Sequence, residues 1–455
     1  MYTISNRLKT FSMVLVILGI LGVAYGFMTS HKSLDEVKTM LAEEHSAHGG
    51  AHVAAPDAHH SDNATESHQS ASENAGAHAQ TNHDDAHAEH VQHQLANRPW
   101  AALYVAALFF MMIALGALAF YAIQFAAQAG WSPLLFRVME GITAYLLPGA
   151  LIVLVIAVAS GTVGHYNLFV WMDPDVVAHD KLIQGKSGWL NLTAFVIRGL
   201  IFIGGWYLYR HFSRKFSIAQ DNAEEGDNTN FKKSFRIAAG FLVFFIYTES
   251  IMSWDWIMSV DPHWFSTLFG WYVFAGMAVC AVTVIAMVTM YLKSKGLLPN
   301  VNDSHIHDLA KYMFGFSIFW TYLWFSQFML IWYSNIPEEV TYFITRIEDY
   351  KLPFFGMLVL NFVFPLLILM NSDYKRINWF VIMAGLIILV GHYIDVFNMI
   401  MPATVGDRWD IGIPEIGSIL LFAGLFLFIV FTALTKAPLV AKRNPFIHES
   451  EHFHY

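Results

Sequence analysis

Long apolar stretches alternate with short polar stretches along the whole chain. The apolar core of a lipid bilayer is about 30 Å thick, and a helix of roughly 20 apolar residues can cross it. Ten stretches of that kind lie at residues 9–29, 101–128, 135–160, 189–210, 236–258, 268–292, 309–333, 353–370, 376–398 and 415–435. The pattern predicts an all-α integral membrane protein with ten transmembrane helices.

The order of these spans predicts how the chain is organised. We expect a first transmembrane helix in residues 1–30, four-helix bundles at 99–258 and 259–398, a last transmembrane helix with its preceding loop at 399–435, and a cytoplasmic tail at 436–455. The first and last helices then flank the bundles. The last helix of each bundle carries carboxylates toward one end, as expected for parallel repeats related by an axis along the membrane normal.

Charge distribution predicts the orientation of the spans. Only 13% of the residues are charged, compared with about 25% in soluble domains. Of the 26 Lys and Arg residues, 17 lie on the side that holds the N-terminus, 8 lie on the opposite side and Arg198 lies within a span. Because cytoplasmic loops are enriched in Lys and Arg, we expect both termini to be cytoplasmic and the chain to be a multi-pass protein of a bacterial inner membrane.

Residues 31–98 form the longest segment outside the predicted spans. The segment is rich in Ala, Asp, Glu and Ser and holds 12 of the 22 histidines. Such a composition buries too little apolar surface to offset the entropy of ordering, so the sequence predicts a disordered periplasmic loop. Two interpretations of the histidines fit: a buffer for zinc, copper or nickel, or a soluble spacer.

The chain has one cysteine, Cys280, which lies inside a predicted span. One cysteine cannot hold an iron–sulfur cluster or attach a c-type haem. A histidine-ligated haem needs two membrane histidines at equal depth, and His165, the one partner available for His392, lies at the edge of a span. We therefore predict no metal or cofactor bound by this chain, apart from a quinone whose contact residues the sequence does not identify.

Ionisable side chains inside the spans are the candidates for function. Each costs roughly 2.5–3.5 kcal/mol at the centre of a membrane helix, so several in one chain favour a role in proton movement. No residue is predicted to be catalytic. The candidates for a transmembrane proton path are Glu140, Arg198, Glu249, Asp255, His392 and Asp395.

Two of these candidates are predicted to form an ion pair. Arg198 and Glu249 each lie about nine residues from the outer end of their spans, which places both roughly 14 Å below the outer surface. Adjacent antiparallel helices could bring them together, either as a structural ion pair or as a site on a proton path. Asp255 lies nearer the outer end, with Ser326, Gln327 and Asn361 as further polar groups of a half-channel.

His392 and Asp395 are three residues apart on one predicted helix and therefore share a face. Imidazole titrates near neutral pH, so such a pair suits a proton relay, and it can also accept a proton from a quinol hydroxyl. A satisfied interfacial histidine is the alternative. Glu140 lies near the cytoplasmic start of its span, before Pro148 and Gly149, and either accepts protons from the cytoplasm or reaches out to water.

Two aromatic motifs resemble a known family. The run SVDPHWFSTLFGWY extends from Ser259 to Tyr272, and YLWFSQFMLIWY extends from Tyr322 to Tyr333 and is followed by NIPEE from Asn335 to Glu339. Together with ten spans and a histidine-rich first external loop, these runs are similar to the ActF family, the second quinone-binding membrane subunit of bacterial alternative complex III. That family belongs to the wider polysulfide reductase/NrfD-like membrane proteins.

The resemblance implies a subunit of a quinol:electron-acceptor oxidoreductase with two four-helix bundles and flanking helices. It also implies partners: a homologous membrane subunit, an iron–sulfur protein, and haem c subunits that pass electrons to cytochrome c or to a terminal oxidase. Such a subunit contributes to proton translocation or quinone handling and has no redox centre of its own. Two alternatives stay open, namely an independent ion-coupled transporter and a structural scaffold subunit.

Overall fold

The computed structural model describes residues 2–47, 73–163 and 167–454, and these residues form helices and connecting loops without a β-strand. The longer helices are α1 (Asn6–Ser30), α3 (Glu73–Ala126), α5 (Leu146–Thr162), α8 (Leu192–Asp221), α9 (Thr229–Trp256), α10 (Phe269–Ser294), α11 (Asp303–Ser334), α15 (Asn378–Val405) and α16 (Ile413–Leu434). The shorter helices are α2 (Leu34–Ala47), α4 (Phe136–Ile142), α6 (Pro174–His179), α7 (Lys181–Gly185), α12 (Pro337–Glu348), α13 (Lys351–Leu358), α14 (Phe364–Leu369) and α17 (Ile447–Glu451).

Ten helical stretches of the described chain are long and apolar enough to cross a membrane. They coincide with the ten predicted spans, so the prediction of an all-α protein with ten such helices is confirmed. Several helices extend beyond the predicted limits: α8 continues to Asp221 and α15 continues to Val405. The added part of α8 is polar, with Arg, Lys and Gln among its residues, which are good helix formers.

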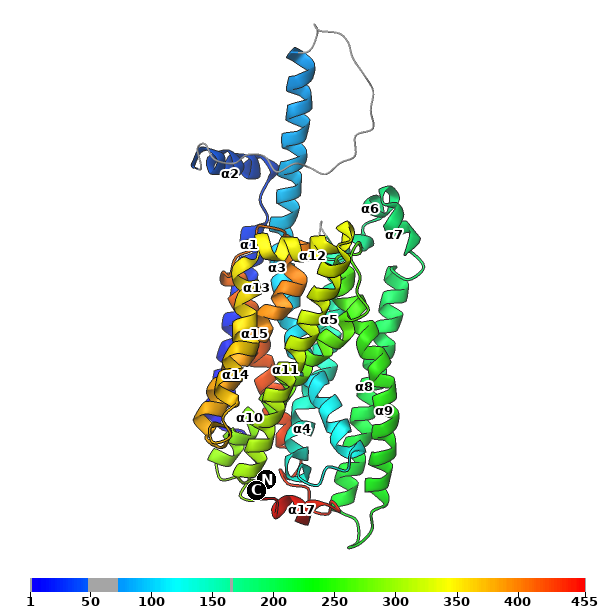
Figure 1. The fold of residues 1–455 in the computed structure, drawn as a ribbon, viewed down its shortest axis with the longest axis vertical. Coiled ribbons are helices and arrows are strands. Elements are labelled where there is room, and N and C mark those ends of the chain that lie inside the picture. Colours follow the sequence, from blue (N-terminus) through cyan, green and yellow to red (C-terminus); the bar gives the residue numbers. More distant parts are fainter. Residues whose placement is uncertain (1, 48–72, 164–166, 455) are drawn as a thin grey trace.

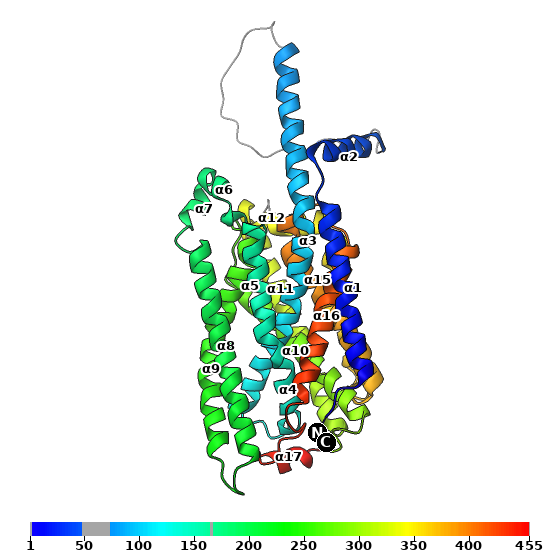
Figure 2. The ribbon, with the colours of Figure 1, turned by 180° about the vertical axis from the view of Figure 1, so that it is seen from behind.

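The long helices run side by side, and the two chain ends lie at the same end of the molecule (Figure 1). We call this the terminal end, and it also carries α17. The opposite end, which we call the arm end, carries α2, α6, α7 and α12 (Figures 1 and 2). The central helix is α3, which packs against α5, α9, α10, α15 and α16. The apolar part of α3 is therefore almost entirely covered by protein.

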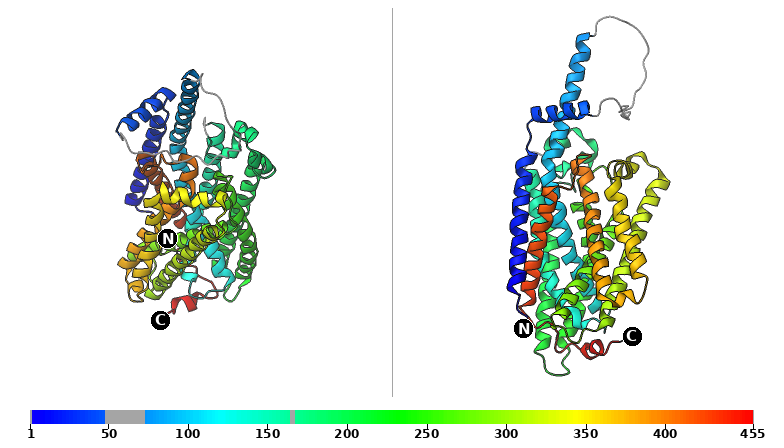
Figure 3. Two further views of the ribbon diagram at one scale, coloured as in Figure 1. Left: turned by 45° about the horizontal axis from the view of Figure 1, so that its top comes forward. Right: turned by 90° about the vertical axis from the view of Figure 1, so that its left-hand side faces the viewer.

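Helices α1 and α16 pack along each other at one side of the molecule (Figure 3). Their close approach depends on glycine. A Cβ atom added at Gly22 would lie 2.8 Å from the Cα atom of Gly417, and one added at Gly19 would lie 2.3 Å from the backbone nitrogen of Leu421. Small residues at such a contact let two membrane helices gain van der Waals packing along their backbones.

Two parts of the segment 31–98 are helical, contrary to the prediction of a disordered loop. Helix α2 lies against the part of α3 that projects beyond the other helices (Figures 1 and 2). Val37 and Leu41 of α2 pack on Ala88 and Val91 of α3 and form a small separate core. An ion pair of 2.5 Å between Lys38 and Asp85 adds to this contact. The remaining residues of the segment, 48–72, and their histidines lie outside the described residues.

Candidate functional site

Asp395 of α15 is a buried carboxylate among the helices, with 1% of its surface exposed. The hydroxyl of Tyr272, on α10, donates a hydrogen bond to one carboxylate oxygen. The indole N–H of Trp320, on α11, donates to the other oxygen at 2.9 Å. Three helices thus position this carboxylate, but both donors are neutral.

His392 lies one helical turn from Asp395, and its Nδ1 is 3.5 Å from the carboxylate. The edge of its ring faces Trp320, with 5.1 Å between the ring centroids. Neither ring nitrogen has a hydrogen-bond partner among the residues that the structure describes. The prediction that His392 and Asp395 share a face is confirmed. They lie farther from the end of their helix than expected, because α15 continues to Val405, roughly 15–20 Å beyond them.

Two small cavities flank Asp395, each with a volume of about 10 Å³. A cavity of roughly 10–15 Å³ is large enough for one water molecule if polar partners are present. The first is lined by Tyr272, Trp324, Gln327, Tyr342, Phe343, Arg346, Phe354, Met357, Asp395, Asn398 and Met399. The second lies on the His392 side, next to Gly276 and Cys280. Asp395 is thus the polar residue that lines both cavities.

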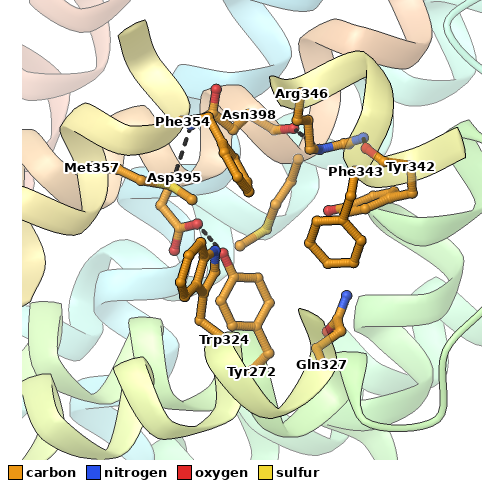
Figure 4. Close-up of a pocket in the computed structure, with 11 residues that line it drawn as sticks. Tyr272, Trp324, Gln327, Tyr342, Phe343, Arg346, Phe354, Met357, Asp395 and Asn398 are labelled. Carbon is orange, nitrogen blue, oxygen red and sulfur yellow. Dashed lines mark hydrogen bonds between the residues drawn. The ribbon is translucent and has the colours of Figure 1, made fainter. Parts of the chain in front are cut away.

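Arg346 of α12 closes the first cavity toward the arm end (Figure 4). Its side chain is 4% exposed. Its Nε donates to the backbone oxygen of Asn398 at 3.0 Å, and its guanidinium lies 3.3 Å from the centroid of the Tyr342 ring. In the described part of the chain, Arg346 forms no salt bridge with a carboxylate. Burial lowers the pKa of this arginine from its usual value, and a cation without an acidic partner faces the cavity of Asp395.

The predicted pair of Arg198 with Glu249 is wrong: Arg198 pairs with Asp255. Its Nε and Nη2 donate to the two carboxylate oxygens at 2.6 and 3.2 Å. The Trp189 indole N–H also donates to Asp255 at 2.8 Å, and the Trp189 ring lies 4.2 Å from the guanidinium. Asp255 is therefore held by a planar, bidentate ion pair at the arm end.

Because Arg198 pairs with Asp255, Glu249 has no cationic partner in the described part of the chain. It is 3% exposed on α9, and its one hydrogen bond comes from the neighbouring hydroxyl of Ser250 at 3.5 Å. Among the described residues, nothing bonds to its other oxygen. A second carboxylate therefore resembles Asp395 in lacking an arginine or lysine partner.

Glu140 of α4 belongs to a buried ion-pair cluster near the terminal end, and at 3% exposure it does not reach out to water. It accepts hydrogen bonds from Arg137 at 2.8 Å and from the Tyr121 hydroxyl at 2.9 Å. Arg137 also pairs with Asp221 at 2.5 Å, and Arg214 lies 3.5 Å from Glu140. The chain bends just beyond, at the short 3₁₀ turn Thr143–Tyr145, close to the kink expected at Pro148.

Several residues of the Asp395 site were not predicted from the sequence. Tyr272 was noticed only as the end of an aromatic motif, and Trp320 gives no signal that separates it from other membrane tryptophans. A π-helical turn at Val359–Val363 was also missed; it carries Asn361, whose side chain is fully buried. Single π-turns often lie at functional sites, and Gln327, one of the predicted polar groups, does line the first cavity.

No metal-binding cluster of three or more His, Cys, Asp or Glu side chains is present in residues 2–47, 73–163 and 167–454. No protein-family model matches the chain, and no curated protein is significantly similar to it.

Proposed function

We propose that this chain is an integral subunit of a quinol-oxidising respiratory complex of the alternative complex III class, in which His392 and Asp395 bind and release protons within the membrane. The observation that carries the proposal is the environment of Asp395. The carboxylate is buried between two water-sized cavities, receives hydrogen bonds from neutral donors only, and has the unpartnered imidazole of His392 3.5 Å away. A proton is the counter-charge that such a pair can share.

The two aromatic motifs support the assignment to this class of complex. The segment from Ser259 to Tyr272 supplies the hydroxyl that binds Asp395, and the segment from Tyr322 to Tyr333 supplies Trp324 and Gln327 of the first cavity. In the proposed complex, haem c and iron–sulfur clusters belong to partner subunits, electrons leave toward cytochrome c or a terminal oxidase, and quinol is the electron donor.

The same proposal includes the orientation of the chain in the membrane and the grouping of its helices. The terminal end, with most of the Lys and Arg residues, faces the cytoplasm of a bacterial cell, and the arm end faces the periplasm. The helices of residues 99–258 and 259–398 form two repeats of four spans, with α1 and α16 at their side. Partner subunits that carry haem then bind at the arm end.

One observation favours a second candidate, an ion-coupled transporter. Transporters bind ions at irregular points of discontinuous helices, and the stretch Lys351–Leu369 is interrupted by the π-helical turn that holds Asn361. The two candidates differ in a simple measurement. Purification of the tagged chain with haem c absorbance supports the respiratory complex, whereas ion transport by the chain alone in vesicles supports the transporter.

Asp395→Asn tests the proposed proton site. Asparagine keeps one oxygen, which can accept from Trp320, and its amide N–H can donate to the rotatable Tyr272 hydroxyl, but it cannot release a proton. In the purified complex reconstituted into liposomes, we expect normal haem content but lowered quinol oxidation and lowered proton release per electron. Asp373→Asn, at an exposed position of the terminal end, is the matched control. If Asp395→Asn leaves both quantities at the level of Asp373→Asn, the proposal is refuted.

A further inference from the structure

A large apolar cleft lies between α15 and α16, with α3 and α10 as its floor. Its volume is about 460 Å³. The lining includes Phe109, Val284, Leu389, Ala423, Phe426 and Phe431, and Tyr393 is the one lining residue that carries a polar group. A cavity of this composition offers a ligand dispersion contacts and almost no hydrogen bonds.

The cleft faces the surroundings of the helices at the level of the membrane. Leu386 and Val390, on its α15 side, are 51% and 55% exposed, and both lie within a helix that is apolar enough to span a bilayer. At that depth the adjoining medium is lipid hydrocarbon. An exposed apolar cleft there is open to lipid chains rather than to water.

The dimensions of the cleft match one acyl chain. An apolar cavity of about 150 Å³ accommodates the six carbons of benzene, so a volume of about 460 Å³ has room for roughly 18 carbons by the same ratio. From Ile419 to Phe431, the α16 side of the cleft is about 18 Å long at 1.5 Å per residue. It begins about 9 Å from the arm end of α16 and extends nearly to its terminal end. Its length is therefore close to that of one leaflet, about 15 Å.

A positive charge lies beyond the terminal end of the cleft, two contacts away from its lining. Phe431 packs edge-on against Tyr291, with 5.3 Å between ring centroids, and the ammonium group of Lys295 lies 5.8 Å from the centroid of the Tyr291 ring. Lys295 is exposed, and in the described part of the chain it forms no salt bridge. A lipid phosphate at the level of the headgroups would complement this charge.

We infer that the cleft binds one acyl chain of an anionic phospholipid from the leaflet at the terminal end, with the phosphate beside Lys295. Phe109 lines both this cleft and the small cavity next to His392. The bound chain therefore contacts Phe109, the residue that the cleft shares with the small cavity next to His392 and Asp395. The binding site itself does not depend on the function proposed for those two residues.

Photo-crosslinking tests the inference. The purified full chain is placed in vesicles of phosphatidylethanolamine that contain a minor fraction of phosphatidylglycerol with a diazirine on one acyl chain, then irradiated, digested and mapped by mass spectrometry. We expect labelling to concentrate on the cleft residues of α15 and α16. Ala423→Phe fills the cleft and should reduce that labelling to the level of other helices. Lys295→Gln should abolish the excess of cleft labelling by the phosphatidylglycerol probe over the same diazirine probe made on phosphatidylcholine.

Ala239→Phe is the matched control, because Ala239 is exposed on α9, and it should leave the labelling unchanged. If Ala423→Phe does not fold, Val390→Trp at the exposed rim blocks the entrance and carries the test. Uniform labelling of all lipid-facing helices overturns the inference, as does unchanged cleft labelling in the folded variants. Recovery of an isoprenoid quinone instead of a phospholipid with the purified protein also overturns it.

Discussion

Replacement of Arg198 with glutamine is expected to destabilise the protein by about 3 kcal/mol. Removing one partner of a buried ion pair costs roughly 3–5 kcal/mol, because the remaining charge stays buried without compensation. Asp255 keeps one hydrogen bond, from Trp189 at 2.8 Å, which places the cost at the lower end of this range. Arg198 is 16% exposed in its side chain, so solvent screening of the pair is weak.

The double variant Arg198→Met/Asp255→Asn separates the ion pair from the positions themselves. Its neutral amide still accepts the Trp189 hydrogen bond, and no unpaired charge remains. We expect the double variant to be about 2 kcal/mol less destabilised than the sum of Arg198→Met and Asp255→Asn, because coupling energies between contacting residues reach about 0.5–3 kcal/mol.

Thermal unfolding of the wild type, Arg198→Met, Asp255→Asn and the double variant in one detergent measures this coupling. Arg198→Gln, measured alongside them, tests the expected loss of about 3 kcal/mol. With an unfolding entropy of about 2.1 cal/mol/K per residue, a chain of 455 residues should lose about 3 °C in Tm for a loss of 3 kcal/mol. Lys233→Gln, at an exposed position of α9, controls for the loss of a cation. Additive effects of the two single changes would refute the assigned pair.

Three further predictions concern packing and charge elsewhere. Gly22→Ala should separate α1 from α16 and lower the Tm, because the new Cβ lies 2.8 Å from a backbone atom, whereas Gly204→Ala, which meets open space, should not. Val37→Asp should release α2 and speed its proteolysis, because burial of that valine contributes about 2 kcal/mol. Hydrogen bonds from a backbone N–H of α7 and from the His263 ring lower the pKa of Asp180, which lies between α6 and α7. The ordered connection between α6 and α7 should therefore persist at neutral pH and be lost as the pH falls below about 4, which amide exchange can measure.

The ten spans could be predicted because hydropathy over about 20 residues is a strong signal, but the partner of Arg198 could not. Counting residues placed Arg198 and Glu249 at one depth and ignored side-chain direction. Side chains on a helix tilt toward its N-terminus, and the N-terminus of α8 lies at the arm end. The long arginine side chain therefore reaches outward to Asp255 instead of Glu249.

The cluster around Glu140 shows a second limit of sequence reasoning. Arg214 and Asp221 lie beyond the predicted span 189–210, where hydropathy decreases, and Arg137 lies at the start of the predicted span 135–160. In the structure α8 continues through Asp221, so Arg214 and Asp221 lie on a helix whose side chains reach Glu140 and Arg137. Hydropathy marks where the apolar stretch ends, but it does not show where the helix ends or which polar side chains meet.

The buried carboxylates differ most clearly in what neutralises them. Glu140 and Asp255 each bond to an arginine within 2.8 Å, so loss of a proton leaves them in an established ion pair. Asp395 and Glu249 have no such partner in the described chain, and a carboxylate in an apolar interior needs either a cation or a proton. Of these two, Asp395 alone lies beside an imidazole and between two cavities. Their bonding partners, and not their depth in the membrane, single out Asp395 as the site of the proposed proton exchange.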